Sequence, residues 1–305
     1  MRNTTMILPA AFPSIVWGWK ELLGLCKIKV VAVMLVCTAV GMALATPGLP
    51  PFSSAVYGLV GIGLASCGAA AFNHVIDRRL DALMSRTSHR PVASKRLPVM
   101  VALGWASLLS LAGIFLLVWQ VNLLVAVLTT ASLIGYALIY TAFLKRATPQ
   151  NIVIGGVAGA APPLLGWVAI TGQITPEPLL LMLIIFAWTP PHFWALAIHK
   201  YDDYARAGIP MLPVTHGIPF TRLQIWLYGW LTVLTTLMPV MIGMSGPLYL
   251  FAVLCLNARF MFWNWKVWRG QDTQAPIGAF WFSIRYLLGV FGALLLDHYV
   301  AALAW

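Results

Sequence analysis

The chain alternates between long apolar stretches and short polar connections. Runs of about 20 apolar residues, long enough to cross a bilayer as a helix, cover residues 28–46, 52–72, 98–119, 121–143, 150–172, 177–198, 222–243, 247–265 and 278–303. Proline and glycine between them, as in Pro47-Gly48 and Pro50-Pro51, are typical of tight turns. The pattern predicts an all-α polytopic membrane protein with nine transmembrane helices.

Composition favours the same fold class. Hydrophobic residues make up 61% of the 305 residues and charged residues only 9%, and the mean hydropathy is +0.86. A water-soluble core of this size cannot hide so much apolar surface. The four cysteines lack a Cys-x-x-Cys spacing, so we expect them to be small structural residues without a metal-binding or redox role.

The basic residues lie almost entirely on one side of the predicted spans. Every Lys and Arg falls in the N-terminal segment or in alternate connections, except Arg285, which lies within the last span. The positive-inside rule then predicts a cytoplasmic N-terminus and an external C-terminus. The net charge of +11 reflects this topology and anionic lipid headgroups. No surface typical of nucleic-acid binding is visible, so we expect no nucleic-acid partner.

Acidic residues are scarce, and half of the eight Asp and Glu lie in two polar segments after the second and sixth spans. We predict that residues 73–97 and 199–221 are cytoplasmic active-site loops of a single domain, residues 1–305, with a cytoplasmic N-terminal segment at 1–27. Because four spans separate the loops, both emerge on the same face. This placement indicates a parallel four-plus-four repeat with a ninth helix appended.

Asn73, Asp77 and Asp81 in the first loop recur every four residues, so a helix presents them on one stripe. Oxygen ligands in a row suit Mg²⁺, which typically binds one or two carboxylates plus substrate phosphates. The alternative is a polar helix end whose acids pair with Arg78 and Arg79. Those neighbours point away from the acids on a helix, so the pattern favours a metal site for a phosphorylated substrate.

Basic residues near the acids are candidates for phosphate contacts. Arg86 and Arg90 belong to the first loop, Lys145 closes the fourth span, and Lys200 lies in the second loop. Arg contacts phosphate through its planar fork and Lys as a point charge. Positive-inside placement, or snorkelling at a helix end, explains the same residues without any function.

The second loop offers Asp203 as a further metal ligand. A helical pattern places His199 and Asp203 on one face, at i and i+4, and points Asp202 elsewhere. His192 and His199 are either ordinary interfacial histidines or residues that contact the substrate or accept a proton.

Several motifs together resemble the UbiA superfamily of intramembrane prenyltransferases. They are Asn73-x-x-x-Asp77-x-x-x-Asp81, Arg86-Thr87-x-x-Arg90-Pro91, Tyr140-Thr141 through Lys145-Arg146 to Thr148-Pro149-Gln150-Asn151, and His192-Phe193-Trp194 leading to Asp203-Tyr204. The acid motif is similar to that of the whole superfamily, whereas the Thr-Pro-Gln-Asn and His-Phe-Trp stretches resemble the branch that farnesylates heme. Many relatives carry a second Asp-x-x-x-Asp, where this chain has His199 before Asp203.

This resemblance implies a Mg²⁺-dependent transfer of the farnesyl group of farnesyl diphosphate to a vinyl group of heme b, which makes heme O. It also implies a bacterial inner-membrane location and a downstream heme A synthase or terminal oxidase that takes the product. One histidine would contact the porphyrin. The implied catalytic and metal-binding residues are Asn73, Asp77, Asp81 and Asp203, and the implied substrate-binding residues are Arg86, Arg90, Lys145, Lys200, His192 and His199.

Other functions are compatible with parts of this pattern. The prenyl acceptor could instead be an aromatic acid of quinone synthesis. A transporter would have its coupling residues near mid-membrane, whereas these acids cluster at one surface. A scaffold gives no reason for clustered acids, and the Asp-Gly-x-x-Ala-Arg opening of CDP-alcohol phosphotransferases is absent. We expect Asp77→Ala to abolish transfer and a replacement of Asp297 to matter little.

Overall fold

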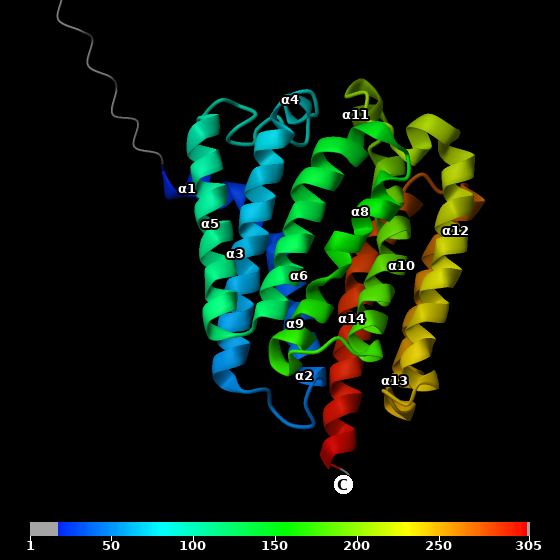
Figure 1. The fold of residues 1–305 in the computed structure, drawn as a ribbon. Coiled ribbons are helices and arrows are strands. Elements are labelled where there is room, and N and C mark those ends of the chain that lie inside the picture. The colour runs from blue at the N-terminus through cyan, green and yellow to red at the C-terminus, as the bar shows by residue number, and fades with distance from the viewer. Residues whose placement is uncertain (1–17, 304–305) are drawn as a thin grey trace, which may run out of the picture.

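The computed structural model describes residues 18–303 as a bundle of long helices (Figure 1). Arg2 and most of the predicted N-terminal segment lie outside the described residues. The elements are α1 (Trp19–Leu25), α2 (Ile28–Leu44), α3 (Phe52–Ile76), α4 (Arg78–Asp81), α5 (Val99–Gln120), α6 (Leu123–Ile134), η1 (Gly135–Leu144), α7 (Lys145–Ala147), α8 (Asn151–Ala160), α9 (Pro162–Thr171), α10 (Pro176–His199), α11 (Tyr201–Arg206), α12 (Leu212–Met241), α13 (Pro247–Arg269) and α14 (Ala275–Leu303).

Each predicted apolar stretch corresponds to one helix or to two helices in succession. In the part of the chain that is described, seven helices are long and apolar enough to cross a membrane, or eight if α1 and α2, bent by 53° at their junction, count as one span. The 23-residue α13 is helical as predicted but is not among them. The all-α polytopic fold is therefore confirmed, and the number of nine spans stays a prediction.

Helix ends follow local signals in the sequence. Proline occupies the first or second position of α9, α10, α12 and α13. A backbone N–H at these positions has no partner within the helix, so its absence in proline costs no hydrogen bond. Gly172 and Gly270 close α9 and α13 in the left-handed conformation. The Asn122 side chain accepts a hydrogen bond of 2.9 Å from the Val125 N–H, which begins α6 after a very short turn.

Both predicted loops contain helical segments. In the segment 73–97, α3 runs on to Ile76 and α4 follows after Asp77. The segment 199–221 contains α11 and the start of α12, which has a break at Gly217, where φ is 82°. The apolar stretch alone missed this start because Pro213, Gly217 and Pro219 interrupt the first turns of α12 and are typical of turns.

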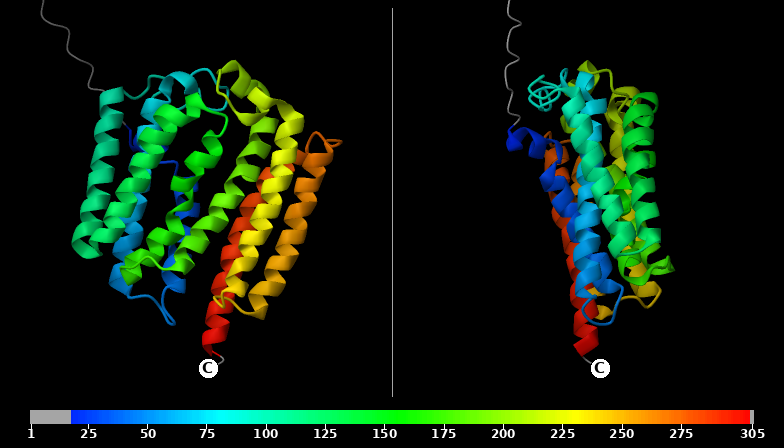
Figure 2. Two further views of the ribbon diagram at one scale, coloured as in Figure 1. Left: turned by 45° about the vertical axis from the view of Figure 1, so that its right-hand side comes forward. Right: turned by 60° about the vertical axis from the view of Figure 1, so that its left-hand side comes forward.

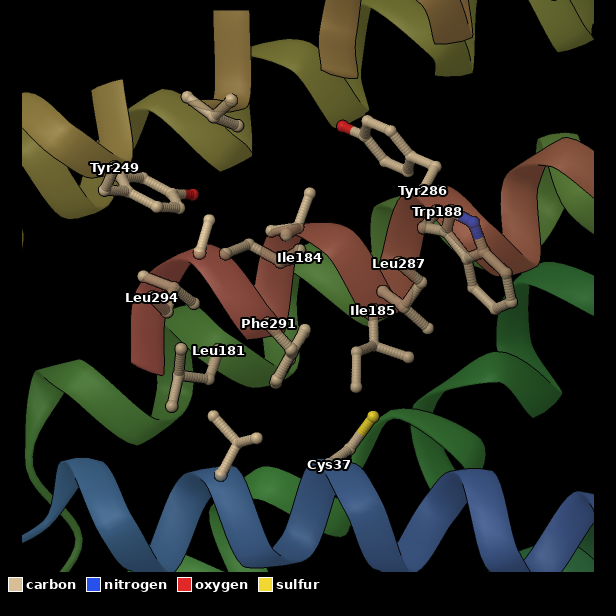
Figure 3. Packing of buried hydrophobic residues seen from close by; sticks show 14 of the residues in the cluster. Cys37, Leu181, Ile184, Ile185, Trp188, Tyr249, Tyr286, Leu287, Phe291 and Leu294 are labelled. Atoms are coloured by element: carbon tan, nitrogen blue, oxygen red, sulfur yellow. The ribbon is translucent and has the colours of Figure 1, made fainter. Parts of the chain in front are cut away.

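The largest hydrophobic cluster joins α2, α10, α13 and α14 in the middle of the bundle. Figure 3 shows the side chains that meet there, among them Cys37, Leu181, Ile184, Tyr286, Phe291 and Leu294. Large apolar side chains on the outside, such as Leu111 and Phe251, are at least 70% exposed. In lipid this outer surface needs no cover, so close van der Waals packing of the inner faces holds the helices together.

The two polar segments lie at the same end of the bundle. Figure 1 shows α4 and α11 at one end and the C-terminus at the other, and both views in Figure 2 show the long helices running side by side between these ends. The predicted placement of both segments on one face is confirmed, and this end of the bundle holds the candidate site.

Asp297 caps α13 near the opposite end. Its carboxylate is 5% exposed and accepts hydrogen bonds from the N–H groups of Gly246 at 2.6 Å and Tyr249 at 3.0 Å. Asp297→Ala leaves both donors unpaired, so we expect it to lower the free energy of unfolding by about 1–3 kcal/mol. The expectation that a replacement of Asp297 matters little therefore applies to catalysis and not to stability. Unfolding in detergent micelles, followed by tryptophan fluorescence, measures the change.

The matched control is Asp202→Ala, at an exposed position, which should unfold like the wild type. Equal stability of the Asp297 and Asp202 variants would contradict the capping role.

Candidate active site

Asn73, Asp77 and Asp81 lie on one stripe, as predicted. The N–H of Asp77 donates to the Asn73 carbonyl at 2.9 Å and the N–H of Asp81 to the Asp77 carbonyl at 2.8 Å, so helical spacing persists across the junction of α3 and α4. The Asn73 amide also donates to Asp77 Oδ2 at 3.0 Å. All three residues are at most 4% exposed. Carboxylates buried this deeply require a base or a cation beside them.

Asp77 and Asp81 each have one oxygen paired with a base that is not their neighbour in the chain. Lys145 Nζ lies 2.6 Å from Asp77 Oδ2, and Arg90 Nη1 lies 2.8 Å from Asp81 Oδ2. Arg78 instead donates to the carbonyl of Val75. The prediction that the adjacent Arg78 is a poor partner for these acids is confirmed, and Lys145 points into the site.

The second oxygen of each acid is available to a ligand. Asp77 Oδ1 and Asp81 Oδ1 are buried and have no hydrogen-bond partner in the described part of the chain. Between residues 18 and 303, no three His, Cys, Asp or Glu side chains lie close enough together to hold a metal ion. Mg²⁺ needs only one or two carboxylates when substrate phosphates and water complete its shell. The donor set therefore fits an ion shared between protein and diphosphate.

The fourth span widens into the π-helix η1 beside these acids. The Thr141 hydroxyl donates to the Tyr136 carbonyl, five residues earlier, at 2.8 Å and accepts from the Asn73 amide at 3.1 Å. A Cβ atom on Gly155 of α8 would overlap the ring of Tyr140, so this glycine makes room for the ring. Wide helical turns are rare and frequently occur at functional sites.

Lys27 also contacts these polar residues, although its position in the sequence indicated only membrane topology. It lies at the bend between α1 and α2 with a φ of 47°, a conformation that costs about 1–3 kcal/mol unless its surroundings hold it. Its Nζ donates to Asn73 Oδ1 at 2.5 Å and to the Tyr136 hydroxyl at 3.4 Å. No local pattern predicts this contact, because 46 residues separate Lys27 from Asn73.

The second polar segment contacts the first through Asp203. Ser85 Oγ donates to both carboxylate oxygens at 3.0 Å, and Arg206 Nη2 lies 2.6 Å from Oδ1. Asp203 is buried and Asp202 is exposed, as predicted. Burial raises the pKa of Asp203, but the hydrogen bonds from Ser85 and Arg206, with the charges of Arg206 and Lys200, outweigh it and hold the pKa below its ordinary value. Asp203 is therefore ionised at neutral pH.

The prediction that His199 and Asp203 share one helix face is wrong. α10 ends at His199, Lys200 leaves the helical conformation with φ −109° and ψ 30°, and α11 begins at Tyr201. His199 is exposed whereas Asp203 is buried. The break turns Asp203 toward Ser85 in the first segment and leaves His199 at the surface.

The remaining candidates differ in their surroundings. His192 is buried between Trp188 and Phe280, with ring centroids 4.3 and 4.5 Å away, and its Nδ1 lies 2.7 Å from Ser283 Oγ. Arg86 is exposed and Lys200 half-buried. Contacts of these residues with a substrate stay predictions.

Comparison with known proteins identifies the family. The family model described as the UbiA prenyltransferase family matches residues 34–296. The chain belongs to this family. It is 58% identical to "Protoheme IX farnesyltransferase 1" of Pseudomonas putida (strain W619), over 93% of this chain and 95% of that one. It is 56% identical to "Protoheme IX farnesyltransferase" of Azotobacter vinelandii, over 92% and 94% of the two chains.

Solved structures share the fold at low sequence identity. A digeranylgeranylglyceryl phosphate synthase superimposes with a TM-score of 0.78 at 15% identity, over 92% of this chain and 98% of that one. A UbiA homologue from Archaeoglobus fulgidus, bound to DMAPP and Mg²⁺, has a TM-score of 0.64 at 15% identity, over 90% and 99% of the two chains. These similarities confirm a UbiA-like fold.

Proposed function

We propose that this chain transfers the farnesyl group of farnesyl diphosphate to a vinyl group of heme b and so makes heme O. The observation that carries this proposal is the 58% identity to a protoheme IX farnesyltransferase along nearly its whole length. The buried acids and bases at one end of the bundle supply the matching chemistry, because a prenyl diphosphate brings a charged head and an apolar tail to a membrane surface.

Asn73, Asp77 and Asp81 of the first polar segment, with Asp203 of the second, would hold Mg²⁺ at this site. The free oxygens of Asp77 and Asp81 support this assignment. When bound, Mg²⁺ neutralises negative charge on the diphosphate oxygens. The related structure that contains Mg²⁺ and DMAPP belongs to a distant homologue and supports only the class of chemistry.

The protein's own bases stabilise the leaving group. The allylic carbon–oxygen bond breaks with its electron pair on the diphosphate, so negative charge grows at the phosphate oxygens. Lys145 and Arg90 are already held in place by Asp77 and Asp81, and preorganised cations of this kind lower the barrier without further rearrangement. Arg86 and Lys200 add positive charge at the rim.

Exclusion of water protects the allylic cation until the weakly nucleophilic vinyl group attacks. The aromatic rings of Tyr136 and Tyr140 stack on η1 with centroids 5.7 Å apart and offer an apolar wall next to the acids. Water must reach the product later to supply the hydroxyl group of heme O.

The proposed setting is the bacterial inner membrane, with nine spans arranged as a four-plus-four repeat and one further helix. The end of the bundle that carries both α4 and α11 faces the cytoplasm and the C-terminus lies outside. A heme A synthase or terminal oxidase takes the product. Lys145, Arg90 and Arg206 all lie at this end, where they pair with acids. A concentration of basic residues at one end supports this orientation.

Mass spectrometry of extracted heme tests the function. Cells that express the chain should accumulate heme b with an added farnesyl group and an added hydroxyl group, and cells without it should contain heme b alone. Purified protein should convert heme b but not 4-hydroxybenzoate. Prenylation of the aromatic acid instead would make quinone synthesis the function.

A further inference from the structure

A second concave surface borders the candidate site. A pocket of about 420 Å³ opens between α1, the end of α3 and the loop before α5. Four bases line it, and the one acid in its wall, Glu21, lies 3.5 Å from Arg96. The four bases are Lys20, Lys27, Arg90 and Arg96. Because Arg96 is paired with Glu21 and Arg90 with the neighbouring Asp81, the surplus positive charge of the wall comes from Lys20 and Lys27, and it favours an anionic ligand.

A buried histidine in the same wall lacks a partner. His74 is 3% exposed, and neither of its ring nitrogens has a hydrogen-bond partner within residues 18–303. A buried polar group without a partner costs about 1–3 kcal/mol. Because His74 lines the pocket, a ligand with oxygen atoms can supply the missing partner, and this points to an occupant independently of the charge.

The pocket is directly connected to the catalytic acids. Lys27 lines it and donates to Asn73 at 2.5 Å. Arg90 also lines it and pairs with Asp81 at 2.8 Å. An anion held here lies next to the residues that would hold the diphosphate, without occupying the free oxygens of the acids.

We propose that this pocket binds the two propionate carboxylates of the porphyrin acceptor. The inference rests on the proposed function. A heme carries its two propionate carboxylates on one edge of an apolar ring and its vinyl groups away from that edge. The propionates therefore require basic residues at the boundary with water while the ring enters the bundle. Glu21, the acid in the wall, is engaged by Arg96, so the pocket lacks carboxylates to hold Mg²⁺ for a diphosphate.

The test compares heme b with its dimethyl ester, in which both propionates are neutral. Full-length protein in neutral phosphatidylcholine nanodiscs is titrated with each porphyrin, and the change in Soret absorbance gives the Kd. Lys20→Glu should raise the Kd for heme b about tenfold and leave that for the dimethyl ester unchanged. Lys20→Arg should bind both like the wild type.

Lys29→Glu is the matched control, because Lys29 is an exposed lysine at the start of α2 that does not line the pocket. It should bind both porphyrins like the wild type. Equal weakening of heme b and ester by Lys20→Glu, or no weakening of either, would overturn the proposal.

Two further measurements distinguish the propionates from other anionic ligands of the pocket. A Lys20→Glu effect on the KM for farnesyl diphosphate alone would assign the pocket to diphosphate, and an effect seen only with anionic lipid in the nanodisc would assign it to a headgroup. Either result overturns the proposal. Wild-type protein that binds heme b but forms no farnesylated product refutes the proposed function and leaves the propionate assignment standing.

Discussion

Asp77→Asn is expected to lower the rate of farnesyl transfer about a thousandfold while the protein still folds. The substitution removes one negative charge from a carboxylate whose Oδ1 is buried and unpartnered in the described chain. An amide is a poor ligand for Mg²⁺ by comparison, so the diphosphate would lose part of its cation. The initial rate of farnesylated heme formation, at saturating substrates, measures the loss.

Asparagine at position 77 can keep the structural contacts of the Asp77 side chain. Its side chain accepts from Asn73 and pairs with Lys145 at 2.6 Å, and the amide oxygen can still accept from the lysine. Asp77→Ala should also abolish transfer, but it leaves the mostly buried Lys145 without a counter-charge and so lowers stability.

Asp202→Asn serves as the control, because Asp202 lies in the second polar segment but is exposed. It should retain the wild-type rate. An Asp77→Asn enzyme that remains active with unchanged Mg²⁺ dependence would contradict the metal assignment.

Gly41→Ala should lower the free energy of unfolding by about 2–3 kcal/mol. A Cβ atom at Gly41 of α2 would overlap the carbonyl of Pro163 in α9, and one at Gly166 of α9 would overlap the carbonyl of Thr38 in α2. The two glycines thus allow the backbones to approach reciprocally. Neither neighbour can move aside easily, because both overlapping atoms belong to the backbone.

Thermal unfolding in detergent micelles, followed by circular dichroism, measures this effect. Gly104→Ala is the control, because a Cβ atom at this position of α5 meets nothing within 4 Å; it should be neutral or slightly stabilising. Equal stability of both variants would exclude the proposed backbone contact. Since α2 begins directly after Lys27, we also expect Gly41→Ala to reduce transfer.

The positions of the helices and the stripe of acids were predictable from the sequence. In lipid, backbone hydrogen bonds must be satisfied within a segment, so length and apolarity alone nearly specify a spanning helix. Asn73, Asp77 and Asp81 share a stripe because their spacing matches the helical repeat, which is a local property. The resemblance in the motifs identified the family, as the match over residues 34–296 confirms.

Tertiary structure alone decided which groups meet. Lys145 is 68 residues from Asp77 and Ser85 is 118 residues from Asp203, and no periodicity encodes such distances. The break at Lys200, which turned Asp203 inward and left His199 outside, depends on how α11 packs against the first segment. Helical spacing is set by neighbouring backbone atoms, whereas the contacts of Lys145 with Asp77 and of Ser85 with Asp203 are set by packing between segments distant in the chain.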